Sequence, residues 1–231
     1  MAFEGSASSI CHGLRATFRG RIHAKLSVNL SYTFSKAIDD AEEIFPHTRA
    51  QDMRNFRSER GLALYDQRHR LVLSGLFEIG RPVGEGIGRI LLSDWTVAPI
   101  LEAASGRPVN VLLGTDNNLD QDPSADRPDC VPDNILGSVR TAFGSFAVPP
   151  LGEPGNVGRN AFVGPSFASL NLRLQRNVSL TDRLSAQLIA EAFNLLNRTN
   201  IRAVNPHYAS AGQPLAAHDP RQVQLGLRLR F

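Results

Sequence analysis

The sequence predicts an all-β protein in which antiparallel amphipathic strands form one sheet with long loops at one end. Two observations predict this fold class. Apolar and polar residues alternate with a period of two in seven segments, which places successive side chains on opposite faces of a strand. Short and long connections also alternate along the chain. Because antiparallel neighbours reverse direction at each connection, every long loop falls at the same end of the sheet.

Four of these segments lie in the first half of the chain. Leu14, Ala16 and Phe18 alternate with polar residues over 14–19, and a more regular alternation follows over 26–35. The runs 71–79 and 95–103 are weaker because their second faces are only partly polar. We expect the run 95–103 to continue through 109–113 after a bend at Gly106 to Pro108, since both residue types favour a bulge or bend within a strand.

The other three segments span 169–175, 185–193 and 222–231. The last is closest to an ideal two-faced strand, with apolar residues on one parity and Gln or Arg on the other. Ile189 and Phe193 interrupt the alternation in the middle segment. These patterns predict about seven strands in all.

The arrangement of connections favours a membrane barrel over a soluble sandwich. The long links are 37–67, 114–166 and 196–220, and the shorter ones are 20–24, 80–94 and 177–183. Outer-membrane barrels have short periplasmic turns and long external loops, and their polar strand faces line a hydrated lumen. A soluble β-sandwich binding module, for example for carbohydrate, stays open as an alternative because its strands also bury one face. The sequence therefore predicts part of a large transmembrane β-barrel with long extracellular loops.

Composition excludes several other classes of protein. The 231 residues are 42% hydrophobic, and 25 Lys and Arg against 22 Asp and Glu give a net charge of +3, too small to indicate a nucleic-acid partner. No segment has the roughly 18–20 apolar residues of a membrane-spanning helix. The N-terminus lacks the pattern of a secretory signal. Cys11 and Cys130 stand alone, which predicts two buried thiols and no zinc site or disulfide framework.

The sequence predicts no enzyme and no cofactor-binding residue, because it contains none of the GxSxG, Walker, GxGxxG or HExxH motifs. One metal site is a candidate. Oxygen-bearing side chains occupy alternate positions in the long loop 114–166, as in a calcium-binding loop, at Asp116, Asn118, Asp120 and Asp122. Gln121 stands where such a loop has its sharp-turn glycine, and Arg127 stands where it has glutamate. A solvated acidic loop is the alternative explanation.

Substrate contacts of a barrel are expected in its external loops and among lumen arginines. The first long loop has arginines at 49, 54, 57 and 60, with Asp52 and Glu59 between them. This spacing predicts a short helix with its own salt bridges in preference to a substrate-binding patch.

Short segments spread through the chain, in their order and spacing, resemble the C-terminal barrel of Oar-like TonB-dependent transporters. These segments are Leu30–Asp40, Asp66–Ser74, Asp94–Val97, Ser105–Val109, Asp126–Pro128, Gly158–Asn160 and Glu191–Asn197. The resemblance covers roughly Gly13 to Phe231. It implies that residues 13–231 are the C-terminal portion of such a barrel and that residues 1–12 are a truncated lead-in.

The resemblance also implies location and partners. Complete members carry a signal peptide, an N-terminal domain, a TonB-interacting segment, a plug and a barrel of about 22 strands. This chain is thus expected to be a fragment, not competent alone, that reaches the TonB system only through the missing N-terminal region. The intact protein would lie in the cell outer membrane, in contact with lipid, and take up or export a large ligand. A surface adhesion protein anchored by the barrel is a further alternative.

The C-terminal strand carries one more implied site. The chain ends in an aromatic residue, which is typical of outer-membrane barrels and is read by the barrel-assembly machinery. The resemblance therefore implies an assembly signal at Leu227, Leu229 and Phe231.

Overall fold

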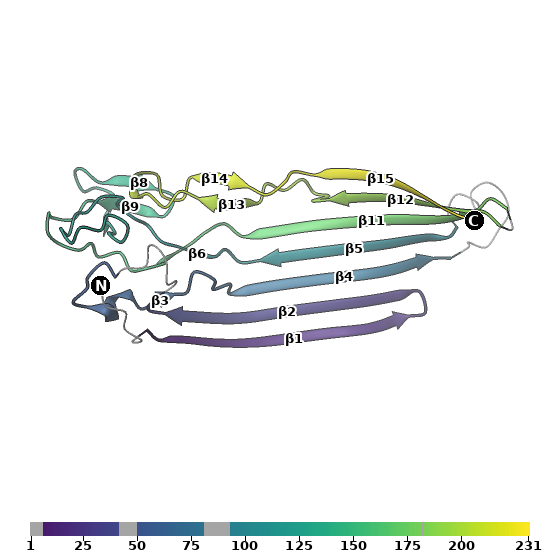
Figure 1. The fold of residues 1–231 in the computed structure, drawn as a ribbon, viewed down its shortest axis with the longest axis horizontal. Coiled ribbons are helices and arrows are strands. Elements are labelled where there is room, and N and C mark those ends of the chain that lie inside the picture. Colours follow the sequence, from purple (N-terminus) through teal and green to yellow (C-terminus); the bar gives the residue numbers. More distant parts are fainter. Residues whose placement is uncertain (1–6, 42–49, 81–92, 182) are drawn as a thin grey trace.

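A computed structural model describes residues 7–41, 50–80, 93–181 and 183–231. One long antiparallel sheet dominates it, and the smaller sheets gather at one end of the long strands (Figure 1). In sheet order the long strands are β1 (Ser9–His23), β2 (Leu26–Asp39), β4 (His69–Ile79), β5 (Trp95–Ala104), β11 (Phe167–Ser179), β12 (Ser185–Phe193) and β15 (Gln222–Arg230). The fold class expected from the sequence is confirmed, including its seven long strands.

The remaining elements are short and belong to the loops. Three small pairings join β3 (Gly61–Leu62) to β2, β6 (Pro108–Val109) to β10 (Phe162–Val163), and β13 (Ile201–Val204) to β14 (Pro214–Ala217). A three-stranded sheet has the order β7 (Asp129–Val131), β9 (Gly144–Ala147) and β8 (Val139–Thr141). Two 3-10 helices, η1 (Phe56–Glu59) and η2 (Tyr208–Ser210), complete the described structure. In this part of the chain no helix is long and apolar enough to cross a membrane.

The strand register brings the apolar parity of neighbouring strands to one face of the sheet. Across five strands, Phe18 lies opposite Leu30, Leu30 opposite Leu73, Leu73 opposite Leu101, and Leu101 opposite Leu170. A slip of one residue in any pair would turn that strand's apolar set to the other face. The alternation seen in the sequence therefore produces one continuous apolar surface.

Charged and amide side chains hydrogen-bond to one another across the opposite face. Arg173 lies opposite Glu191, and its Nη1 donates to Oε1 at 3.3 Å. The side-chain amide of Gln224, on the next strand, donates to the other Glu191 oxygen. Near the other edge, Arg19 Nε donates to Asn29 Oδ1 at 3.0 Å. These cross-strand contacts are those expected on a face that meets water.

Neither face of the long sheet is covered by a second sheet among the described residues. The apolar face is accordingly exposed, with Leu14 65% and Leu225 81% accessible. A soluble sandwich would bury this face against its second layer, so the sandwich alternative lacks its defining contact. Both β1 and β15 have one strand neighbour within the described part of the chain, so the sheet is an open portion of wall.

β1 starts at Ser9, which pairs with Asp39, so the sheet includes residues 9–12. Two local expectations were wrong. β5 ends at Ala104, and the chain beyond the Gly106 bend pairs with β10 instead of extending the wall. Both cysteines are exposed, because Cys11 lies on the edge strand β1 and Cys130 on a small loop sheet.

Candidate recognition surface at the loop end of the sheet

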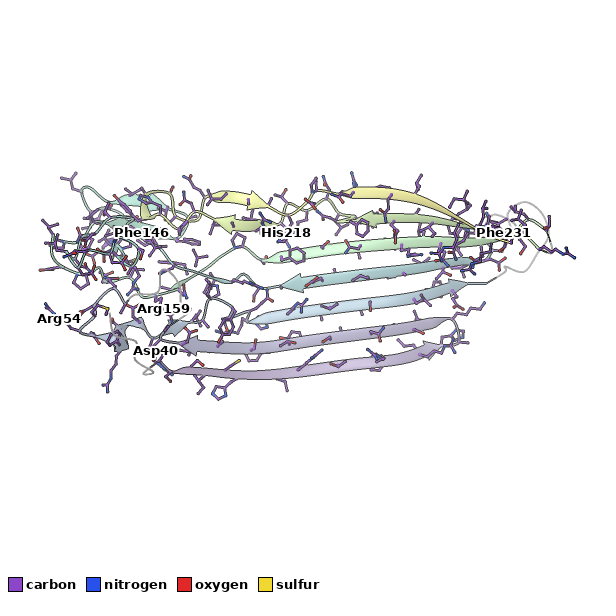
Figure 2. All side chains as sticks on the ribbon, in the orientation of Figure 1. Asp40, Arg54, Phe146, Arg159, His218 and Phe231 are labelled. Carbon is purple, nitrogen blue, oxygen red and sulfur yellow. The ribbon has the colours of Figure 1, made fainter. Side chains whose placement is uncertain are left out.

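The long loops fold into a cap that contains the apolar core of the structure. Buried Val111, Phe146, Val157 and Ala211 form this core, and partly buried aromatic residues pack around it. Figure 2 places Phe146 among the crowded side chains at the loop end, far from Phe231 at the other end of the strands. A single-layer wall cannot enclose a core of its own, so the interior of this molecule lies in its loops.

A buried ion pair ties η1 to the central loop of the cap. Arg127 Nη2 and Nη1 donate to the Glu59 carboxylate oxygens at 2.7 and 2.8 Å, and both side chains are at most 4% exposed. Arg127 Nε also donates to the Val157 carbonyl at 2.9 Å. The expected helix in this loop is only the four-residue η1, and its Glu59 pairs with a distant loop instead of a neighbouring arginine. Residue 49 lies outside the described residues.

A second buried arginine ties the cap to the end of the sheet. Arg159 pairs with the Asp39 carboxylate at the end of β2, and its Nε donates to the Glu59 carbonyl at 2.6 Å. The neighbouring Asn160 donates from Nδ2 to the Leu62 carbonyl at 2.8 Å. Two segments that carry the family resemblance, Asp126–Pro128 and Gly158–Asn160, therefore meet at one anchor. The buried side chains of Arg127 and Arg159 hold the loops together, and too little of their surface is exposed to contact a ligand.

The segment Asp66–Ser74 anchors the entry to β4 in a similar way. Asp66 is buried, accepts a hydrogen bond from the Ala37 amide at 2.6 Å and lies 3.7 Å from Arg68 Nη2. On the outer-rim side of the sheet, His69 Nδ1 and Tyr32 Oη are 2.8 Å apart. Asp66 therefore joins the start of β4 to the end of β2, with Arg68 as its charge partner.

A hollow of about 930 Å³ lies between the cap and the outer ends of β4, β5 and β11. Its polar lining includes Arg70, Glu102, Arg107, Arg202 and His218. Arg70 Nη2 is paired with Glu102 Oε1 at 2.8 Å. Arg107 and Arg202 are exposed. Because three arginines face one glutamate, this hollow suits ligands with carboxylate or phosphate groups, which match the guanidinium fork.

The acidic segment expected to bind calcium lies in the cap, between β6 and β7. Its side chains accept hydrogen bonds from backbone amides of the same loop: Asp116 from Asp120 and Gln121, Asn118 from Asp120, Asp120 from Asp122, and Asp122 from Ser124. No three His, Cys, Asp or Glu side chains within the described ranges are already arranged around a metal position. The calcium site stays a prediction.

The expected assembly signal lies on β15 at the far end of the sheet from the cap. Leu227 and Leu229 lie opposite Leu188 and Ala186, on the apolar face, and Phe231 follows the last strand residue and is fully exposed. This geometry presents three apolar side chains at an open edge. Their use by an assembly machinery stays a prediction.

Comparison with known proteins agrees with this architecture. Residues 2–224 match the family described as "Outer membrane beta barrel domain". The chain belongs to this family. Strands of outer-membrane barrels alternate between an apolar outward face and a polar face toward the lumen, and the two faces of this sheet show the same division.

Among solved structures, P. aeruginosa FpvA, in a complex with a heterologous pyoverdine and iron, is similar over 96% of this chain with 14% sequence identity and a TM-score of 0.49. The chain spans 19% of the length of that protein. No curated protein matches significantly.

Proposed function

We propose that this chain forms part of the barrel wall and external loops of a TonB-dependent outer-membrane transporter, which takes up or exports a large ligand. The observation that carries the proposal is the shared register of the seven strands, which separates one apolar face from one hydrogen-bonded polar face. The family match supports an outer-membrane barrel. The Oar-like, energised character rests on the resemblance of the short sequence segments described above.

In this proposal the wall is passive and the cap provides recognition. The buried Glu59–Arg127 pair joins two loops of the cap, and the buried Asp39–Arg159 pair fastens the cap to the end of β2. A rigid support positions exposed loop residues for a ligand. The arginine-rich hollow beneath the cap is the surface where we place the first contact with a ligand that carries negative groups. Energy from the TonB system would act through other parts of the intact protein.

Cysteine scanning along β2 tests the membrane part of the proposal. In a background with Cys11→Ser and Cys130→Ser, single cysteines are placed at residues 28–33 and labelled in isolated outer membranes with a water-soluble maleimide. We expect the positions of Asn29, Ser31 and Thr33 to react and the alternate positions to stay unlabelled until detergent is added. Equal labelling of both parities in intact membranes would contradict a lipid-facing sheet.

Transport is tested with the intact gene product. Ligand uptake or export should stop in a strain that lacks TonB, while the amount of protein in the outer membrane stays the same. An adhesion protein anchored by the barrel would retain its surface binding in that strain, so the two functions are distinguishable.

A further inference from the structure

The acidic loop between β6 and β7 holds a feature that hydrogen bonds within the loop do not explain. Asp126 is only 2% exposed, and its Oδ2 accepts hydrogen bonds from the amides of Asn117 and Asn118 at 2.5 and 2.9 Å. Its Oδ1 is buried and has no hydrogen-bond partner. A buried carboxylate oxygen without a hydrogen bond lowers the stability of the folded protein. A cation bound to this atom would remove that cost.

The charges around Asp126 increase this cost. The carboxylates of Asp120 and Asp116 add two negative charges close to the buried Asp126. The adjacent Arg127 guanidinium cannot supply the counter-charge, because it is engaged by Glu59. Three carboxylates thus lie close enough to repel one another, without a basic side chain bound to any of them among the described contacts.

The loop backbone already has the shape that a cation-binding loop requires. Asp116 accepts hydrogen bonds from the amides of Asp120 and Gln121, at 3.1 and 2.9 Å, which folds the loop back on its own start. Gln121 has φ +70°, the left-handed conformation for which calcium loops use glycine at this sixth position. The departure seen in the sequence therefore changes the residue type but not the backbone conformation.

We propose that this loop is a calcium site in which the orphaned Oδ1 of Asp126 is the central ligand, joined by side-chain oxygens of Asp116, Asn118 and Asp120. Asp126 holds position eleven of the loop and supplies the carboxylate that Arg127 cannot supply at position twelve. All the donors are hard oxygens on a loop that can adjust, which favours Ca²⁺ over Mg²⁺ and zinc. Asp122 turns toward Ser124 and contributes only charge.

Binding requires a small local adjustment. No three carboxylates in the described structure already converge on one point. Each carboxylate oxygen has two lone pairs, so Asp116 and Asp120 can bind a cation while they keep their backbone hydrogen bonds. The bound ion would cancel the repulsion among the three acids and fix the loop beside the Glu59–Arg127 pair. The proposal concerns this loop alone and does not depend on transport.

Calorimetric titration of the full chain with CaCl₂, after chelator treatment, tests the site. We expect saturable binding with a Kd of about 10⁻⁴ to 10⁻³ M, the range of extracellular calcium modules. Asp126→Asn keeps an acceptor for the two backbone amides but removes the charge, and should weaken binding at least tenfold. Asp120→Asn, at a half-buried position, should do the same with less risk to folding. Asp133→Asn, in an exposed ion pair of the same cap, is the matched control.

Hydrogen exchange provides a second readout. Calcium should slow exchange of the Asn117, Asn118 and Gln121 amides in the unmodified chain and in Asp133→Asn, but not in Asp126→Asn or Asp120→Asn. Two results would overturn the proposal: no calcium heat up to about 10 mM, ten times the upper end of the expected range, or equal affinity in the unmodified chain and Asp120→Asn. If Asp126→Asn does not fold, Asp120→Asn decides.

Discussion

Arg127 is the residue whose replacement tests the architecture of the cap most directly. Its guanidinium donates hydrogen bonds of 2.7 and 2.8 Å to Glu59 and one of 2.9 Å to the Val157 carbonyl, all in the buried interior. Arg127→Met keeps apolar volume but removes all three bonds and leaves a buried carboxylate without its counter-charge. Breaking one side of a buried pair costs about 3–5 kcal/mol. We expect the free energy of cap opening to fall by this amount.

Hydrogen exchange in outer-membrane vesicles measures this change. Because about 1.4 kcal/mol corresponds to a factor of ten, amides protected by the closed cap should exchange between a hundredfold and a few thousandfold faster. The amides of Leu113 and Val157, which donate to carbonyls of Asp126 and Pro128, are suitable reporters. The double variant Glu59→Leu with Arg127→Met should recover part of the loss, since no buried charge then remains unpaired.

The control is the exposed ion pair between Arg140 and Asp133, whose side chains are 78% and 57% accessible. Arg140→Met should change exchange by less than about fivefold, because exposed pairs contribute roughly 0–1 kcal/mol. If Arg127→Met stays within threefold of the unmodified protein, or matches Arg140→Met, the buried pair does not hold the cap and the reasoning fails.

Three other perturbations test the wall and its junction with the cap. A Cβ at Gly106 would lie 1.8 Å from the Gly164 carbonyl oxygen, so Gly106→Ala should lower the free energy of unfolding in urea by about 1–3 kcal/mol. Gly75→Ala is the control and should be neutral, because no heavy atom lies nearer than 3.6 Å to the added Cβ. Leu30→Arg on the lipid face should cost about 2–4 kcal/mol and Ser31→Arg on the lumen face almost nothing; equal costs would contradict the assignment of faces. Phe231→Ala should slow assembly into the outer membrane without changing the assembled protein's unfolding midpoint, and unchanged assembly kinetics would rule out an assembly signal there.

The wall could be predicted from the sequence because its physics is local. Each strand needs apolar side chains toward lipid and polar side chains toward water, and this demand leaves a period of two that is visible without any knowledge of partners. Leu26 to Phe34 alternates with Ser27 to Ser35, and pairing to β1 and β4 preserves that division. The alternation of short and long links then fixed which end carries the loops.

The cap could not be predicted because its contacts are long-range. Glu59 and Arg127 are 68 residues apart, and Asp39 and Arg159 are 120 apart. Nothing in the local sequence distinguishes Glu59 from the other charges of its loop, so an internal salt bridge on a short helix was the natural expectation. A faint signal existed in the flanking residues, since Asp126-Arg127-Pro128 and Gly158-Arg159-Asn160 are charged yet stand beside Pro and Gly in loops.

The candidate calcium loop combines a feature that the local sequence predicts with one that depends on long-range packing. The oxygen-bearing side chains at 116, 118, 120 and 122 were evident in the sequence. The lack of glycine at 121 and of glutamate at 127 counted against a calcium site. Only the fold showed that Gln121 adopts the glycine-like conformation and that Asp126 is buried with an unsatisfied oxygen. Burial of a single carboxylate depends on packing from distant segments, which a short motif does not encode.

The sequence by itself determined the class of the protein: an open wall of amphipathic antiparallel strands with two chemically different faces and long loops at one end. Alternation is a property of consecutive residues, so a lipid-facing sheet can be recognised before it folds. The tertiary structure alone decided that the loops contain the apolar core, that buried Arg127 joins the loops to one another and buried Arg159 joins them to β2, and that the arginine-lined hollow opens beneath them. These features depend on which residues, distant in the sequence, become buried together. A buried charge needs a partner, and only the packed chain brings that partner into contact.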